Sequence, residues 1–124
     1  MKVAISANAP GLDADVDPRF GRCQYFAIGD TDTMKFEFIE NSSMAAGGGA
    51  GISAAQTIVD KGVKAVLTGN CGPNAYQVLE AAGVQVITGV SGTVKQAIND
   101  FKAGKLKAAS QPSVKAHHGM GETK

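Results

Sequence analysis

Apolar runs separated by glycine-rich or polar breaks predict an α/β protein. Short, partly β-branched runs predict strands over 1–7, 24–29, 35–40 and 63–67, and a fifth strand that begins at Val84. Apolar residues at helical spacing predict helices over 52–61, after Pro73, and over 93–102. Residues 30–33, which join the second and third strands, are interpreted as the turn of a hairpin.

The chain is organised around a predicted strand, tight loop and helix over 62–83. The loop is Gly69-Asn70-Cys71-Gly72, and Pro73 suits the first turn of the following helix because its missing N–H has no intrahelical partner there. This loop places the Cys71 thiol beside a helix N-terminus, where unpaired N–H groups and the helix dipole favour an anion. We therefore expect the pKa of Cys71 to be lowered.

Residues 83–102 repeat this unit in shorter form. Two consecutive units imply parallel strands joined by right-handed helical crossovers. In the strand order 3-2-1-4-5, the loops 47–51, 69–72 and 89–92 meet the long segment 8–23 at the carboxyl edge of the sheet, where open α/β sheets bind ligands. Strands one and four are then neighbours, so Cys23 and Cys71 are expected to approach each other.

Composition excludes several classes of protein. With 124 residues, a formal net charge of +1 and two cysteines, the chain offers no electrostatic case for nucleic acid and no disulfide scaffold. No segment is long enough to span a membrane, and Met1 leads directly into a strand pattern, so we expect a cytoplasmic location. The loops lack a P-loop or GxGxxG pattern, and the predicted central strands carry no carboxylates for a two-metal nuclease. Residues 107–124 have little apolar surface and are expected to be disordered.

Three motifs occur in an order that matches a known family: Arg19-Phe20-Gly21-Arg22, Gly69-Asn70-Cys71-Gly72-Pro73-Asn74-Ala75 and Ser91-Gly92-Thr93-Val94. Over residues 1–106 the chain resembles the dinitrogenase iron-molybdenum cofactor biosynthesis family, which includes NifX and the carboxy-terminal domain of NifB. The resemblance implies a ribonuclease H-like, three-layer αβα fold with a mixed five-stranded sheet in which strand two is antiparallel. It also implies binding or carrying of an iron-sulfur or molybdenum-containing cluster.

The candidate metal ligands are Cys71 and Cys23, because thiolates are suitable soft ligands for iron and copper. Two thiols cannot fill a four-coordinate site, so a cluster needs its own sulfides, a second subunit, or His117 and His118. The candidate cluster-binding residues are those of the glycine-rich loops, which would donate N–H bonds, and one arginine: Gly48, Gly49, Gly69, Asn70, Gly72, Asn74, Ser91, Gly92, Thr93 and Arg22. The alternative for these residues is structural: packing cysteines, and arginines paired with aspartates of segment 8–23.

These observations favour a non-enzymatic carrier or scaffold for a metal-sulfur cluster, working with a cluster-donating or cluster-receiving protein. The alternative is a metal-free regulatory module that takes a phosphate-bearing ligand or a protein partner at the same edge. No base, nucleophile and orienting group occur together, so no catalytic role is expected. The sequence leaves the identity of the cluster, the client protein and the oligomeric state open.

Overall fold

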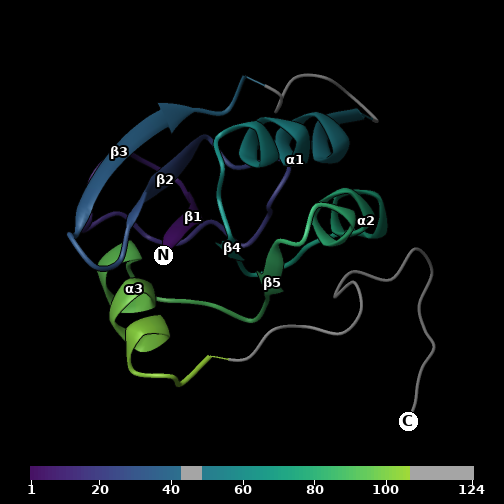
Figure 1. Cartoon of the computed structure of the whole chain (residues 1–124). Coiled ribbons are helices and arrows are strands. Elements are labelled where there is room, and N and C mark those ends of the chain that lie inside the picture. The colour runs from purple at the N-terminus through teal and green to yellow at the C-terminus, as the bar shows by residue number, and fades with distance from the viewer. Residues whose placement is uncertain (43–48, 107–124) are drawn as a thin grey trace, which may run out of the picture.

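A five-stranded sheet lies between two layers of helices in the computed structural model, which describes residues 1–42 and 49–106 (Figure 1). The strands are β1 (Lys2–Ala7), β2 (Tyr25–Asp30), β3 (Lys35–Glu40), β4 (Ala65–Leu67) and β5 (Gln85–Ile87). The helices are α1 (Ala50–Asp60), α2 (Pro73–Ala81) and α3 (Val94–Lys102). This sequence of elements confirms the predicted α/β fold.

The sheet has the strand order β3-β2-β1-β4-β5. Strand β2 is antiparallel to β1 and β3, whereas β4 is parallel to β1 and β5 is parallel to β4. Strands β4 and β5 are shorter than predicted, but the pairing continues before them: the Lys64 N–H donates to the Lys2 carbonyl at 2.8 Å. The predicted order and the antiparallel second strand are both confirmed.

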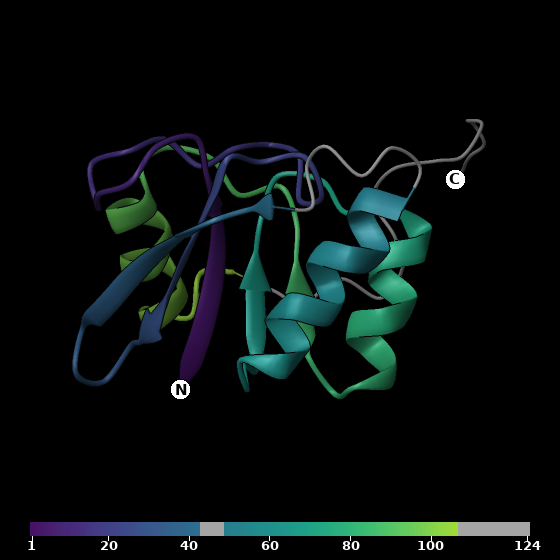
Figure 2. The same cartoon turned by 90° about the horizontal axis from the view of Figure 1, so that it is seen from above.

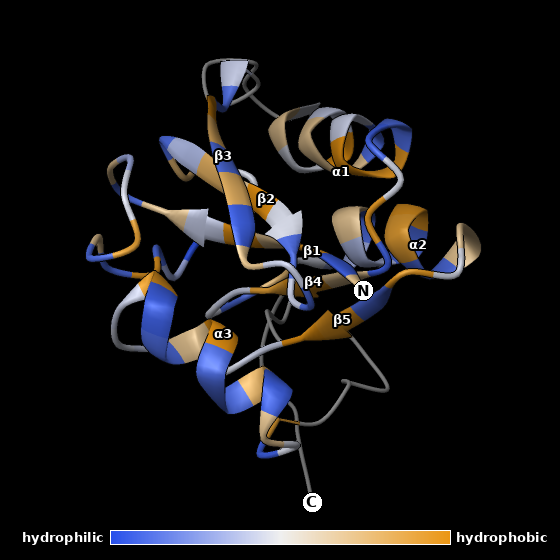
Figure 3. Cartoon of the chain, turned by 60° about the vertical axis from the view of Figure 1, so that its left-hand side comes forward, coloured by the Kyte–Doolittle hydropathy of each residue, from blue (hydrophilic) through white to orange (hydrophobic). Residues whose placement is uncertain are grey.

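Two hydrophobic cores lie on opposite faces of the sheet. Because successive side chains of a strand point to opposite faces, β1 supplies both cores: Ala4 packs on the side of α1 and α2, and Val3 and Ile5 pack on the side of α3. Figure 2 shows α1 and α2 side by side on one face and α3 on the other. Figure 3 shows the polar outer turns of α3, whose buried side is formed by Val94, Ala97 and Ile98.

Helix α1 begins at Ala50 rather than at the predicted Ile52, so Gly51 lies in its first turn. A Cβ atom on Gly51 would lie 3.5 Å from the Cβ of Ala75 in α2. A Cβ atom on Gly21 would lie 2.8 Å from the Cα of Gly51, closer than side chains tolerate. These glycines therefore allow the start of α1 to pack closely against segment 8–23 and lie beside the start of α2, and need not interrupt the helix.

Segment 8–23, called the strap below, crosses the carboxyl edge of the sheet. Near its start it holds α3, because the Val94 N–H donates to the Ala14 carbonyl at 2.8 Å. In its middle, the Asp17 N–H donates to the Ser6 carbonyl of β1 at 2.9 Å. Further along, the Asn70 N–H donates to the Pro18 carbonyl at 2.7 Å. The strap thus connects the ends of β1 and β4 with the start of α3.

Within residues 1–42 and 49–106, none of the helices has the length and apolar character needed to cross a membrane. The predicted tail, residues 107–124, lies outside the described residues. The domain boundary at residue 106 and the disorder of the tail therefore stay predictions.

Candidate functional site

The loops that were predicted to converge do meet at the carboxyl edge of the sheet (Figure 2). The contact between the strap and the loop after β4 is close, since a Cβ atom on Gly69 would lie 2.6 Å from the Cα of Pro18. Gly49 is the N-cap residue of α1 and is exposed at the same edge. Gly48, another candidate residue, lies outside the described residues.

Cys71 lies at the carboxyl edge, but its side chain is 0% exposed. Its Sγ lies 3.8 Å from the carbonyl oxygen of Gly72. Burial raises the pKa of Cys71 to about 11. The prediction of a lowered pKa is therefore wrong for this structure, because the loss of hydration outweighs the favourable field of the helix N-terminus.

Cys23 is also buried, and it acts as a hydrogen-bond donor to the strap. Its Sγ donates to the Phe20 carbonyl at 3.3 Å, while the Asn41 amide donates to the Cys23 carbonyl at 2.8 Å. Burial and the nearby Asp17 carboxylate raise the pKa of Cys23 to about 12. Both cysteines are free thiols in the hydrophobic core under α1 and α2, so the topology brings them to the same side of the sheet as expected.

The α2 entry, residues 69–75, leaves backbone donors available. Helix α2 has Gly72 as its N-cap residue, without a side-chain cap, and no acidic residue in its first turn. The N–H groups of Asn74 and Ala75 find no acceptor among the residues that the structure describes. Helix α1, which packs beside α2, also lacks a side-chain cap and an acidic first turn in the described part of the chain. Two helix N-termini with donors for an anion therefore lie beside Cys71.

The α3 entry, residues 89–96, has its donors occupied. The Thr93 hydroxyl accepts from the Gln96 N–H at 3.1 Å, and the Gln96 side chain accepts from the Thr93 N–H at 2.9 Å, which forms a capping box. The strap accepts from the Val94 N–H, and the Lys95 N–H donates to the Leu12 carbonyl at 2.9 Å. The candidate residues Ser91, Gly92 and Thr93 thus belong to an entry that the chain closes by itself.

The two arginines of the strap differ in their surroundings. Arg19 pairs with Asp17 through Nε and Oδ1 at 3.3 Å, and this side chain is 63% exposed while that of Asp17 is 5% exposed. The pairing is the structural role that the sequence offered as the alternative for Arg19. Arg22 is exposed at the end of the strap that leads to Cys23.

Sequence reasoning missed three residues that organise this edge: Ser6, Thr68 and Asn41. The Ser6 hydroxyl donates to the Asp17 carbonyl at 2.6 Å and lies 2.8 Å from the Thr68 hydroxyl, which must donate to it because the Ser6 proton is already used. Polar residues at the ends of two apolar strands were the available signal. Asn41 had no comparable signal, because its partners lie on the strap.

No group of three or more His, Cys, Asp or Glu side chains in residues 1–42 and 49–106 is placed to hold a metal ion. His117 and His118, the remaining candidates from the sequence, lie outside these residues. The described part of the chain therefore does not supply a complete coordination shell, and a cluster bound here would have to bring its own bridging ligands.

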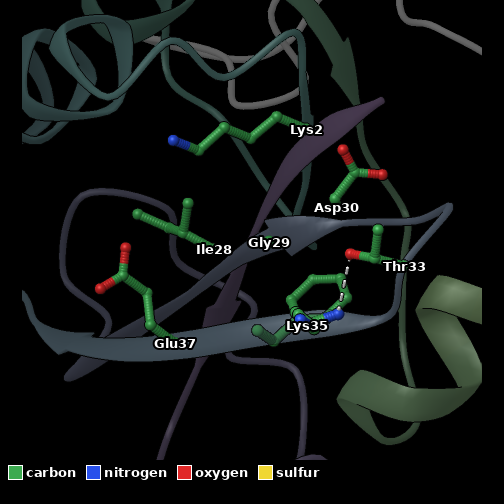
Figure 4. A pocket seen from close by; sticks show the side chains of 8 residues that line it. Lys2, Ile28, Gly29, Asp30, Thr33, Lys35 and Glu37 are labelled. Carbon is green, nitrogen blue, oxygen red and sulfur yellow. Dashed lines mark hydrogen bonds between the residues drawn. The ribbon is translucent and has the colours of Figure 1, made fainter.

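An open cavity of about 390 Å³ lies at the opposite edge of the sheet, beside the start of β1 and the β2–β3 turn (Figure 4). Its charged lining residues are Lys2, Asp30, Lys35 and Glu37, which balance in sign. No thiol or imidazole lines this cavity. It therefore offers no soft metal ligand, and the candidate site is confined to the carboxyl edge.

Comparisons with known proteins agree on one family. A family model described as dinitrogenase iron-molybdenum cofactor matches residues 1–104. The structure is similar to the apo form of the orange protein (ORP) from Desulfovibrio gigas, with a TM-score of 0.88 and 42% identity over 91% of this chain and 96% of that chain. It is similar to a candidate NifB protein from Thermotoga, with a TM-score of 0.76 and 39% identity over 86% of this chain and 91% of that chain. An uncharacterised protein of Methanocaldococcus jannaschii is 32% identical over 111 residues, which are 86% of this chain and 94% of that protein.

Proposed function

We propose that this chain, which belongs to the dinitrogenase iron-molybdenum cofactor family, binds an iron-sulfur or molybdenum-containing cluster as cargo and passes it on without catalysing a reaction. The family is of a cofactor-biosynthesis or carrier type. The observation that supports the proposal best is the pair of uncapped helix N-termini, of α1 and α2, beside the thiol of Cys71. One solved relative is described as an apo form, the term for a protein without its bound group.

The electrostatics of this end of the sheet suit an anionic cargo. Metal-sulfur clusters with bridging sulfides carry negative charge, and helix N-termini favour anions through their dipoles and their unpaired N–H groups. In this proposal, donors for sulfide or oxo groups come from the loops around Gly49, Gly69, Asn70, Gly72 and Asn74. Arg22 adds a cation from the strap.

Of the two cysteines, Cys71 is proposed as the metal ligand. Cys23 donates its S–H to the Phe20 carbonyl and lies near the Asp17 carboxylate, which opposes formation of a second negative charge. No acidic side chain contributes to the raised pKa of Cys71, for which burial is the cause. A metal ion could therefore displace the proton of Cys71 more readily than that of Cys23.

The α3 entry has a structural task in this proposal, because its first-turn donors are already bonded. Contacts of Ser91, Gly92 and Thr93 with the cargo stay predictions from the sequence. So do a cytoplasmic location and a cluster-donating or cluster-receiving partner protein.

The test is anaerobic purification, followed by absorption spectra and iron, molybdenum, copper and sulfide analysis before and after incubation with iron, molybdate and sulfide. Charge-transfer bands with stoichiometric metal are expected in the native chain and in Cys23→Ala, and are expected to be lost in Cys71→Ala. Circular dichroism of each variant establishes that it has folded. Equal loss in both variants would contradict the assignment of Cys71 as the ligand.

A second candidate function is a metal-free module that binds a phosphate-bearing ligand through the same N–H groups. It is favoured by the buried, protonated state of both thiols and by the missing three-ligand group in the described residues. A colourless, metal-free chain after reconstitution, together with phosphate-ligand binding that survives Cys71→Ala, would support this candidate over the carrier.

A further inference from the structure

We propose that Pro18–Phe20 of the strap form a latch over Cys71, and that cargo reaches this thiol only after the latch has opened. The nature of what enters rests on the proposed function. The sealing and opening of the thiol are properties of the fold, and they can be measured without any metal.

The latch holds the residue that immediately precedes Cys71. The Asn70 N–H donates to the Pro18 carbonyl at 2.7 Å, and the Phe20 N–H donates to the Asn70 carbonyl at 3.2 Å. Arg19 and Asn70 accordingly form an isolated parallel bridge. Both backbone polar groups of Asn70 are therefore bound to the latch, which fixes the position of the peptide on one side of the thiol.

Phe20 links the two cysteine-bearing segments. Its N–H bonds to Asn70, and its carbonyl accepts from the Sγ of Cys23 at 3.3 Å. Its side chain is 2% exposed and belongs to the same hydrophobic core as both cysteines, with a ring centroid 5.2 Å from that of Phe26. Displacement of Phe20 from this core would therefore free the backbone beside Cys71.

Cys71 lies one layer below the surface. Asn70, Pro73 and Asn74 are exposed, whereas the Cys71 side chain is not accessible to solvent. A cluster is larger than a thiol, so it cannot reach the sulfur of the closed form. The contacts between latch and loop are two hydrogen bonds and the close approach of Gly69 to Pro18, a small part of the fold, so they can break locally while the sheet stays intact.

The first test uses the unaltered chain. Alkylation by iodoacetamide is followed at increasing urea, and peptide mass analysis assigns the label to Cys71 or Cys23. We expect Cys71 to be labelled at a rate nearly independent of urea below the unfolding transition, at least about tenfold faster than global unfolding allows. Labelling of Cys71 only through global unfolding would overturn the latch. Cys23, which Asn41 also holds, serves as the internal reference.

The second test opens the latch by substitution. Gly69→Ala places a methyl group 2.6 Å from the Cα of Pro18, whereas Gly72→Ala adds the same group in the same loop with nothing within 4 Å. Relative to the global stability of each variant, Gly69→Ala is expected to accelerate Cys71 labelling about tenfold, and Gly72→Ala no more than about twofold. Equal rates in two folded variants would contradict the proposal. If Gly69→Ala does not fold, the urea series on the unaltered chain decides.

The outcomes separate the latch from the proposed function. Local labelling of Cys71 in a chain that takes up no metal would support the latch and contradict the carrier. Metal uptake by a chain whose Cys71 is labelled only through global unfolding would overturn the latch and leave the carrier in place.

Discussion

The α2 and α3 entries are built on the same plan, a short parallel strand, a Gly-x-x-Gly loop and a helix that starts at the carboxyl edge. Their donors are treated differently. At the α3 entry a capping box and the strap bind the first-turn N–H groups. At the α2 entry Gly72 provides no side-chain cap, and the N–H groups of Asn74 and Ala75 have no acceptor within the described ranges.

This difference suggests which entry serves the fold and which serves a ligand. N-capping residues typically contribute about 1 kcal/mol, so an uncapped helix gives up stability that the neighbouring unit has obtained. The equivalent loop positions are Cys71 and Ser91, and the buried thiol occurs at the uncapped entry. Open donors and a soft ligand therefore coincide at one of the two units.

The strongest test of the comparison concerns Gly69 and Gly89, which open the two loops. Gly69 is required for space, because its Cβ would meet Pro18, whereas Gly89 is required for its φ of +74° and has nothing within 4 Å. We expect Gly69→Ala to reduce the free energy of unfolding by about 3 kcal/mol. We expect Gly89→Ala to reduce it by about 1 kcal/mol. Urea unfolding measures both, and a larger loss for Gly89→Ala would contradict the role of the strap contact.

The fold was predictable because its signals are local and periodic. The apolar runs that became β1 and β4, and the spacing of the helices, determine the sheet once two consecutive strand-loop-helix units are recognised. The start of α1 was misplaced because glycine was weighted for flexibility, whereas Gly51 is needed for its contacts with Gly21 and Ala75. Such a contact depends on the packed structure and leaves no periodic signal.

The candidate site was predictable only in outline. The motif around Cys71 located the loop, but the direction of the pKa shift depends on burial, which the strap and the first turns of α1 and α2 create together. Similarly, nothing in the local sequence distinguishes the occupied donors of the α3 entry from the open donors of the α2 entry, because the acceptors Leu12 and Ala14 lie far away in the chain.

The capping difference itself is tested by alanine substitution at each entry. Thr93→Ala removes the capping box and is expected to reduce the free energy of unfolding by about 1 to 2 kcal/mol. Asn74→Ala, at an exposed position that caps nothing, is expected to change it by less than about 0.3 kcal/mol. Denaturant unfolding followed by circular dichroism measures both. Similar losses at the two positions would mean that the entries are not distinguished by capping.

The buried thiol predicts an alkaline loss of stability. An unfolded thiol has a pKa of about 8.5, whereas burial raises the pKa of Cys71 to about 11. The native state then holds more protons than the unfolded state at alkaline pH, so this contribution is complete below the unfolded pKa and is lost as the pH rises toward the folded pKa. In urea titrations from pH ~8 to pH ~10.5, we expect Cys71→Ser to remove about 1 kcal/mol of the decline. Ser91→Cys, which adds an exposed thiol at the equivalent position, should leave the decline unchanged; an equal effect of both would contradict the difference in burial.

The smallest expected effect on stability comes from giving the α2 entry a cap. Gly72 has φ −72° and ψ 169°, which suits an N-cap residue, and a side chain there has nothing within 4 Å. Gly72→Asp should raise the free energy of unfolding by about 0.5 kcal/mol, because its carboxylate can accept from the open N–H groups and interacts favourably with the helix dipole. The same substitution should abolish uptake of an anionic cluster, whereas Gly72→Ser, a neutral cap, should only weaken it. A more stable Gly72→Asp variant that still takes up stoichiometric metal would mean that the uncapped donors have no part in binding, since they would then be occupied in a protein that functions unchanged.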